Sequence, residues 1–348
     1  MARKTKDLSP LTTLIRKGIS NQMEDLLFVI NAILPIILMI VVGYFLKKIN
    51  LLESEMAKKL NTLVFRIFLP VMLFLNVYKI QNFSDIDFVF VWYAIGMTIL
   101  FFLIGIPLMG IIFKDNRQRS VMLQGIFRAN YALVGIPLAE SLFGVEGSIM
   151  ASLLSAFIVP IFNILAVICL TIYSAGDKKP SISEVIKGVA KNPLIQAIFC
   201  GFVALGIRAI LVKCNVDFRL SDIIPVYKTL QNLSNVATPL SLLVLGARFE
   251  LSAIPHLKKH IVIAVINRIV LVPFIGISLA IALNRFTGAQ FASFIACFCT
   301  PVAVSSVPMS QEMGADADLM GQIVVWTTIF SAFSIFIASY VLRVIGIF

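Results

Sequence analysis

Long apolar stretches alternate with short polar ones along almost the whole chain. Ten of the apolar stretches reach the roughly 20 residues that a helix needs to cross a bilayer. The pattern therefore predicts an all-α polytopic membrane protein with ten transmembrane helices. The predicted spans cover residues 26–47, 58–79, 88–113, 119–143, 148–173, 193–212, 227–248, 260–283, 288–312 and 318–346.

Two of the predicted spans carry helix-breaking and polar residues in their interior. Residues 128–140, in span four, include Gly, Pro and Asn, and residues 300–312, in span nine, include two prolines and three serines. Non-helical backbone at membrane depth is tolerated only where protein or a water-filled cavity satisfies its polar groups. Matching breaks in two halves of a chain are typical of a transporter's binding site. Spans four and nine are therefore predicted to be broken helices around a ligand.

The breaks belong to a longer internal similarity. Pro70 aligns with Pro239 at an offset of 169 residues, and Pro137 aligns with Pro308 at an offset of 171. Ten spans divide into two sets of five, and an odd number per set places the two halves in opposite orientations, as in many secondary transporters with inverted repeats. The alternative is a chance alignment, because proline is fairly common in transmembrane helices.

This repeat divides the chain into four parts. The basic residues 1–22 are expected to form a poorly ordered N-terminal extension. Residues 23–173 and 193–348 would be the two five-helix repeats. The cytoplasmic connector 174–192 contains a predicted amphipathic helix on the membrane surface, with Ser181 or Ser183 as its cap.

Composition and charge agree with a multi-pass protein of the plasma or inner cell membrane. Hydrophobic residues make up 59% of the chain, charged residues 14%, and the mean hydropathy is +0.97, outside the range of soluble domains. Most of the net charge of +11 lies in the odd-numbered loops and the N-terminal tail. The positive-inside rule places those loops against the anionic inner leaflet and both termini outside, although the basic tail favours the opposite orientation.

Motifs of other protein classes are missing from the sequence. It contains no nucleotide-binding loop, no paired-His zinc motif and no intramembrane protease signature. We therefore expect neither an enzyme nor a cofactor, and no binding of nucleic acid.

The predicted breaks are rich in neutral hydrogen-bonding side chains. Asn130 and Tyr131 lie in the first break, and Thr300, Ser305 and Ser306 lie in or beside the second. A broken helix also leaves backbone amides and carbonyls without partners. Such a site suits a small organic solute that carries a carboxylate. Alternatively, these side chains only satisfy the interrupted backbone.

Charged residues inside the spans are functional hypotheses by default. Arg66, Arg128 and Arg268 lie close enough to a cytoplasmic span end to snorkel back to the interface. For Arg268 we favour snorkelling, whereas Arg66 and Arg128 are equally candidates for gating or for attracting an anion. Glu140 and Glu312 lie about one turn beyond Pro137 and Pro308, and either is a candidate carrier of a coupling proton. Glu312 with Gln311 is alternatively a candidate sodium site, and no other metal site is predicted.

Several short motifs, taken in order, resemble the auxin efflux carrier family. They are Leu34-Pro35 with Gly43-Tyr44-Phe45-Leu46-Lys47-Lys48, Phe68-Leu69-Pro70, Gly125-Ile126-Phe127-Arg128-Ala129-Asn130-Tyr131 with Gly135-Ile136-Pro137, Asn192-Pro193 with Gly201, Asn235 through Pro239 to Gly246, and Thr300-Pro301. The family includes bacterial organic-anion permeases and plant PIN-type auxin exporters, and is distantly similar to the bile acid:sodium symporters. A bacterial origin is the expectation from this resemblance.

The resemblance implies a fold like that of sodium/proton antiporters or bile acid symporters. Spans 1, 2, 6 and 7 would form a scaffold, and spans 3–5 and 8–10 a transport bundle in which helices four and nine cross. It further implies alternating access, a small carboxylate substrate such as malate, malonate or an auxin-like acid, and a homodimer through the scaffold. A proton, sodium or no ion remains open as the coupling partner. A sodium-coupled symporter, a channel and a ligand-binding membrane sensor are the alternatives.

The combined reasoning yields two sets of site residues. The predicted substrate contacts are Asn130, Tyr131, Gly135, Pro137, Thr300, Pro301, Val302, Ser305, Ser306, Leu73 and Ser241. The coupling or gating candidates are Arg66, Arg128, Glu140, Gln311 and Glu312.

Overall fold

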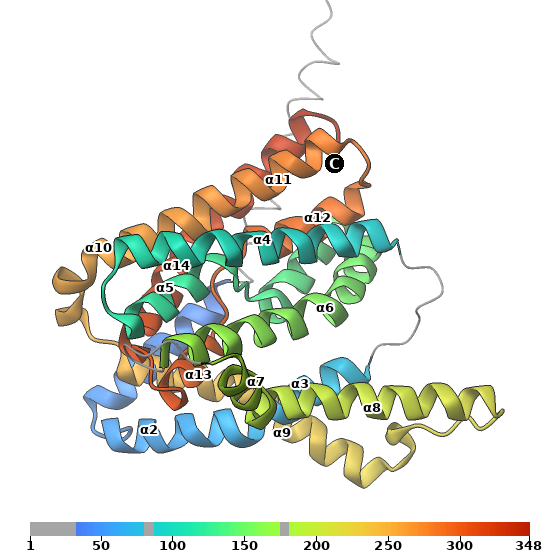
Figure 1. Cartoon of the computed structure of the whole chain (residues 1–348), viewed down its shortest axis with the longest axis horizontal. Helices are drawn as coiled ribbons and strands as arrows, with labels where there is room; N and C mark the ends of the chain where they lie inside the picture. Colours follow the sequence, from blue (N-terminus) through green and yellow to red (C-terminus); the bar gives the residue numbers. More distant parts are fainter. Residues whose placement is uncertain (1–32, 80–86, 175–180) are drawn as a thin grey trace, which may run out of the picture.

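The computed structural model describes residues 33–79, 87–174 and 181–348 (Figure 1). These residues fold almost entirely into helices, and the extended structure among them is an isolated antiparallel bridge between Ala129 and Val302. The predicted N-terminal extension 1–22 lies outside the described residues, as does the beginning of the first predicted span.

The helices follow one another with short connections. The first part of the chain contains a helix over 33–48, then α2 (Ser54–Leu63), η1 (Val64–Phe68), α3 (Leu69–Tyr78), α4 (Phe88–Ile112), α5 (Asn116–Phe127), η2 (Tyr131–Gly135) and α6 (Ile136–Ser174). The remainder contains α7 (Ile182–Lys191), α8 (Pro193–Lys213), η3 (Leu220–Asp222), α9 (Ile224–Arg248), η4 (Leu251–Ala253), α10 (Ile254–Val265), η5 (Ile266–Leu271), α11 (Val272–Leu283), α12 (Gly288–Phe298), α13 (Ser306–Glu312) and α14 (Ala317–Val344). The connector helix α7 is capped by Ser181, whose hydroxyl accepts a hydrogen bond from the Glu184 N–H at 3.2 Å.

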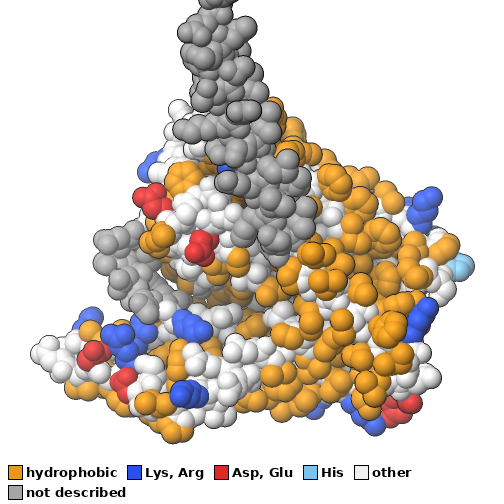
Figure 2. Space-filling model, turned by 180° about the vertical axis from the view of Figure 1, so that it is seen from behind, with side chains coloured by type: hydrophobic (Ala, Val, Ile, Leu, Met, Phe, Trp, Pro, Cys, Tyr) orange, Lys and Arg blue, Asp and Glu red, His pale blue; other side chains and the backbone are white. Residues whose placement is uncertain are grey.

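Six helices of the described chain are long and apolar enough to cross a membrane. Hydrophobic side chains cover a broad face of the molecule, and Lys and Arg lie mostly toward its borders (Figure 2). The protein is therefore an all-helical, membrane-spanning one. The number of ten spans and their inverted pairing stay predictions. The six helices are Ser54–Tyr78, Phe88–Ile112, Tyr131–Tyr173, Pro193–Lys213, Leu251–Leu283 and Ala317–Val344.

Three π-helical segments of the described chain each end two residues before a proline. Proline has no N–H, and its ring clashes with the carbonyl four residues earlier, so a wider turn relieves the clash without ending the helix. Pro239, by contrast, lies inside α9 with no such segment. The π segments are η1 before Pro70, η2 before Pro137 and η5 before Pro273.

Gly144 divides α6 into two helical stretches. Phe143 and Gly144 both have non-helical backbone angles, and Gly144 has a φ of +60° and a ψ of −150°. That region is open essentially to glycine alone. The kink falls at the boundary that the hydrophobic pattern placed between spans 119–143 and 148–173.

The helices form two groups. α3 packs along α8 and α9, whereas α12 packs along α6, and α4 packs along α5. Figure 1 shows α2, α3, α8 and α9 together along the lower side of the molecule, and α4, α10, α11 and α12 in its upper part. We call the first set, with the helix over 33–48, the lower group, and α4, α5, α6 and α10–α14 the upper group.

Two glycines bring the helix over 33–48 against α9. A Cβ atom on Gly246 would lie 2.0 Å from the carbonyl oxygen of Ile40, and one on Gly43 would lie 2.1 Å from that of Leu243. Lipid tails are as apolar as leucine, so membrane helices associate through close van der Waals contact, which small residues permit. The glycines thus hold these two helices together within the lower group.

Candidate functional site

The two predicted breaks meet in the interior of the protein. Helix α5 ends at Phe127 before η2 begins at Tyr131, and α12 ends at Phe298 before α13 begins at Ser306. The Asn130 N–H donates to the Pro301 carbonyl at 2.8 Å, and the Ala303 N–H donates to the Arg128 carbonyl at 3.4 Å. Backbone groups that the breaks release therefore satisfy one another, as the low-dielectric interior requires.

A cavity of about 210 Å³ lies beside this junction. Both groups of helices contribute to its walls, and apolar side chains alternate with polar ones. The lining residues come from α3 (Leu69, Met72, Leu73, Asn76), the first break and the start of η2 (128–133), α6 (Val159, Phe162, Asn163), α9 (Thr238, Ser241) and the second break (Ala303, Val304, Ser305).

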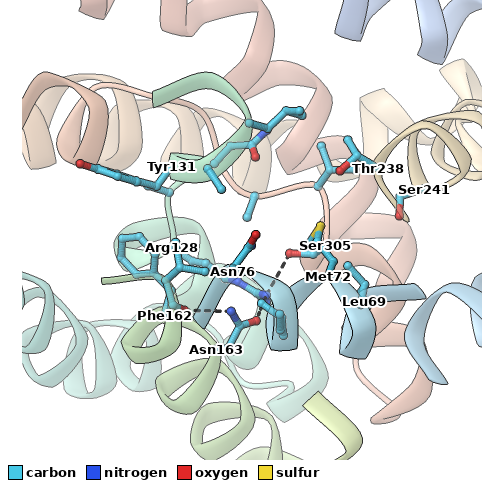
Figure 3. A pocket seen from close by; sticks show the side chains of 18 residues that line it. Leu69, Met72, Asn76, Arg128, Tyr131, Phe162, Asn163, Thr238, Ser241 and Ser305 are labelled. Atoms are coloured by element: carbon cyan, nitrogen blue, oxygen red, sulfur yellow. Dashed lines mark hydrogen bonds between the residues drawn. The ribbon is translucent and has the colours of Figure 1, made fainter. Parts of the chain in front are cut away.

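Arg128 places a positive charge in the cavity wall. Its guanidinium donates to Gln124 Oε1 at 2.9 Å, Asn163 Oδ1 at 2.8 Å and Ser305 Oγ at 3.1 Å, and approaches the Met309 sulfur at 3.0 Å. All of these partners are neutral. Arg128 is 1% exposed and takes part in no ion pair with the described residues. Figure 3 shows the guanidinium between Asn163 and Ser305.

Asn130 adds an unused donor to the same wall. The residue is 8% exposed, and its side-chain nitrogen has no hydrogen-bond partner within the described structure. A buried amide without a partner costs roughly 1–3 kcal/mol. A ligand oxygen in the cavity would recover that energy. The next residue, Tyr131, is 1% exposed and lines the cavity as well.

Arg268 does not snorkel to the membrane interface, so that interpretation of the sequence is wrong. It is 1% exposed, and its guanidinium donates to the carbonyls of Thr300 at 2.8 Å, Ile126 at 3.2 Å and Cys297 at 2.9 Å. These carbonyls lie where α5 and α12 end. These three carbonyls have no intrahelical partner, and hydrogen bonds between them and a buried guanidinium stabilise both sides. Arg268 therefore binds them and does not extend to the distant interface.

The structure brings some of the predicted substrate contacts together and leaves others apart. Thr300 donates its hydroxyl to the Ala296 carbonyl at 2.6 Å, which removes it from the cavity. The first break lies at 128–130, seven residues before Pro137, because η2 accommodates that proline. Asn130, Tyr131, Ser305, Leu73 and Ser241 line the cavity, whereas Gly135, Pro137, Thr300, Pro301, Val302 and Ser306 do not.

Three polar lining residues were missed by reasoning from the sequence. Asn76 lies one turn beyond Leu73 on α3, and Thr238 lies one turn before Ser241 on α9. Helical spacing from those predicted positions would have found both. Asn163 was identifiable as an amide inside an apolar span. Figure 3 shows Thr238 and Ser241 approaching the cavity from α9.

Comparison with known proteins places the chain in a family of membrane transport proteins. Residues 28–339 match the family described as membrane transport protein, which is the auxin efflux carrier family. The chain belongs to this family. The resemblance drawn from the motifs is thereby confirmed. An uncharacterized transporter of Methanocaldococcus jannaschii is 25% identical over 321 residues, which cover 90% of this chain and 98% of that protein.

As a member of the membrane transport protein family, the chain is a transport protein and not an enzyme. Its predicted coupling candidates are all outside the cavity except Arg128. Glu140 is exposed, and its carboxylate accepts a hydrogen bond from Ser148 at 3.4 Å. It thus faces the surface of the transport protein and makes no contact with the junction of the two breaks.

Glu312 and Gln311 connect the end of α13 to the lower group of helices. Glu312 accepts a hydrogen bond from the Thr62 hydroxyl at 2.5 Å and forms an ion pair with Arg66 at 3.7 Å. Gln311 accepts one from Arg248 on α9. These polar contacts join α13 of the transport protein to α2, η1 and α9.

Proposed function

We propose that this membrane transport protein is a secondary transporter that carries a small organic anion. The observation that supports it most is that the guanidinium of Arg128 lines a cavity and has only neutral partners within the described parts of the chain. A buried cation without an ion-pair partner is costly, and a bound anion would remove that cost. The proposed site consists of Arg128, Asn130, Ser305, Asn76 and Asn163.

A carboxylate fits both the polar and the apolar parts of the cavity. Its oxygens accept hydrogen bonds from a guanidinium and an amide, and such charge-assisted bonds are the strong ones. The hydrocarbon part of the ligand would lie against Met72, Leu73 and Phe162. Malate-, malonate- and auxin-like acids are the candidate substrates.

We further propose alternating access as the mechanism. The cavity lies between the lower group, which contributes α3 and α9, and the upper group, which contributes both breaks. Movement of one group against the other would present the site first to one side of the membrane and then to the other. The ten-span inverted repeat, with a scaffold of spans 1, 2, 6 and 7 and crossing helices four and nine, belongs to this proposal.

The placement in the membrane is part of the same proposal. The basic odd-numbered loops would face the cytoplasm and the anionic inner leaflet of the cell membrane, with both termini outside. The side chains of α8 are mostly exposed, for example Phe199 at 67%. They would face lipid or a second copy of the chain in a homodimer through the scaffold.

The proposed function is tested by uptake of radiolabelled small carboxylates into proteoliposomes. Saturable uptake of one carboxylate supports it. Binding without uptake would instead favour a membrane sensor, and single-channel current steps would favour a channel. Absence of both uptake and binding across the panel would overturn the proposed substrate class.

Replacing Asn130 with alanine tests the amide directly. We expect the Asn130→Ala variant to take up the carboxylate about tenfold more slowly, because one hydrogen bond to a charged group is lost. The matched control is Ser306→Ala, since Ser306 is buried beside the second break but does not line the cavity. Equal uptake by the parent and a correctly folded Asn130→Ala variant would contradict the proposed site.

A proton carried by Glu312 is the coupling that we propose first, because this carboxylate joins the two groups of helices. The Glu312→Gln variant should then lose the response of uptake to an imposed pH gradient and keep uptake down the substrate gradient. Glu146→Gln is the control, since Glu146 is exposed on α6. An unchanged pH response in Glu312→Gln would exclude this carrier. A sodium requirement of the parent would favour the alternative, a symporter with sodium near Gln311 and Glu312.

A further inference from the structure

The guanidinium of Arg268 joins the ends of the two helices that precede the breaks. Ile126 lies in the last turn of α5, Cys297 lies in the last turn of α12, and Thr300 lies just beyond it. Each of their carbonyls receives one N–H of Arg268, at 3.2, 2.9 and 2.8 Å respectively. A single side chain thus holds both helix ends.

Both of these helix ends carry partial negative charge. The last four carbonyls of a helix lack intrahelical partners, and the aligned peptide dipoles place about half a negative charge there. Two such ends close together repel each other and also repel an anion in the neighbouring cavity. Arg268 neutralises both, and no carboxylate among the described residues forms an ion pair with it.

The acceptors around Arg268 are of the kind that a hard metal cation takes as ligands. Backbone carbonyl oxygens at interrupted membrane helices hold sodium in transporters of other architectures. Here the charge belongs to a side chain and is therefore covalently attached. It is also permanent, because a guanidinium does not lose its proton in proteins. The side chain is also enclosed by protein, since only 1% of it is exposed.

We infer that Arg268 is a built-in cation that takes the place of a bound metal ion at the junction of the two breaks. Its charge adds to that of Arg128 in the preference of the cavity for anions, and the carrier needs no sodium at this junction. This inference rests on the proposed function for the anion preference, whereas the replacement of a metal ion stands on the contacts alone. Arg268 is a positioning residue, since it acts through the backbone of the breaks and does not line the cavity.

Two substitutions separate the charge of Arg268 from its hydrogen bonds. Arg268→Lys keeps the charge and loses the planar fork, whereas Arg268→Gln keeps two N–H donors and loses the charge. We expect the Lys variant to transport the carboxylate at a rate closer to that of the parent. The Gln variant should be slower by at least about tenfold, because it loses charge-assisted bonds. Equal uptake by the two variants, both folded by size-exclusion chromatography, would overturn a role of the charge.

Thermal unfolding of the purified protein in sodium chloride and in choline chloride provides a readout that needs no substrate. We expect sodium to leave the Tm of the parent unchanged and to raise the Tm of Arg268→Gln, where the carbonyls have lost their cation. A sodium-dependent Tm that the parent shows and the Glu312→Gln variant retains would overturn the inference, and so would an Arg268→Gln variant whose Tm does not change with sodium. If Arg268→Gln does not fold, the Tm and the uptake of the parent and of Glu312→Gln, each with and without sodium, decide alone.

The two proposals fail in different ways in these experiments. A parent that transports a carboxylate only with sodium, and whose sodium requirement persists in Glu312→Gln, keeps its proposed function and loses the built-in cation. A parent that transports no carboxylate loses its proposed function, whereas the Tm of the Arg268 variants still decides whether the side chain replaces a metal ion.

Discussion

Replacing Arg128 with glutamine should abolish carboxylate uptake. The change removes the charge that Arg128 contributes, the one charged side chain among the described residues of the cavity wall, and at least two of its strong hydrogen bonds to Gln124, Asn163 and Ser305. Each hydrogen bond to a charged group contributes roughly 1.5–3 kcal/mol, so the loss of two corresponds to at least about a hundredfold. Uptake of the best carboxylate into proteoliposomes, at equal amounts of inserted protein, is the measurement.

Two further variants make the Arg128 prediction specific. Arg128→Lys keeps a positive charge but not the fork that reaches Asn163 and Ser305 together, and we expect an intermediate rate. Arg285→Gln is the matched control, because Arg285 is exposed in the loop after α11. A folded Arg128→Gln variant that transports as fast as the control would contradict the anion site, and cation uptake in its place would reverse the proposed charge preference.

Replacing Gly246 with valine should prevent stable folding. The Cβ atom would lie 2.0 Å from the Ile40 carbonyl oxygen and 2.9 Å from the Tyr44 nitrogen. Both are backbone atoms of the facing helix, so no rotamer change relieves the clash, and the helices must separate. We expect a loss of more than about 4 kcal/mol, which few single substitutions reach. Size-exclusion chromatography and Tm in detergent measure it.

The control for this prediction is another glycine-to-valine change in a membrane helix. A Cβ atom on Gly206 of α8 would meet no atom within 4 Å, so Gly206→Val should fold like the parent. If Gly246→Val runs as a monodisperse peak with the parent's Tm, the close contact between α9 and the helix over 33–48 does not exist. The same test applies to Gly43, which faces Leu243.

Much of the candidate site was predictable from the sequence because it follows from composition and spacing. A polar amide and serines inside apolar spans cannot face lipid without cost, which identified Asn130 and Ser305. The matching prolines Pro70 and Pro239 drew attention to Leu73 and Ser241, three and two residues further on, and both line the cavity. Membership of the transport protein family was readable from the order of several weak motifs.

Other features depend on long-range geometry that a single sequence does not contain. The first break was predicted within residues 128–140, but the sequence did not show that it is confined to 128–130 and that a π-helical turn accommodates Pro137. Depth alone favoured snorkelling of Arg268, whereas the carbonyls that bind it come from helices about 30 and about 140 residues away along the chain. Asn163 was identifiable as an amide inside an apolar span, but its hydrogen bond with Arg128 was not foreseeable.

The bridge between Ala129 and Val302 has a mechanical consequence. Backbone hydrogen bonds on both sides of the bridge connect the first break, 128–130, to the second break, 299–305. A shift of one break should therefore displace the other. We therefore expect the two breaks to move together as one unit. A displacement of one break that starts at one face of the membrane should then be transmitted to the other break, and so to the opposite face, at the same time.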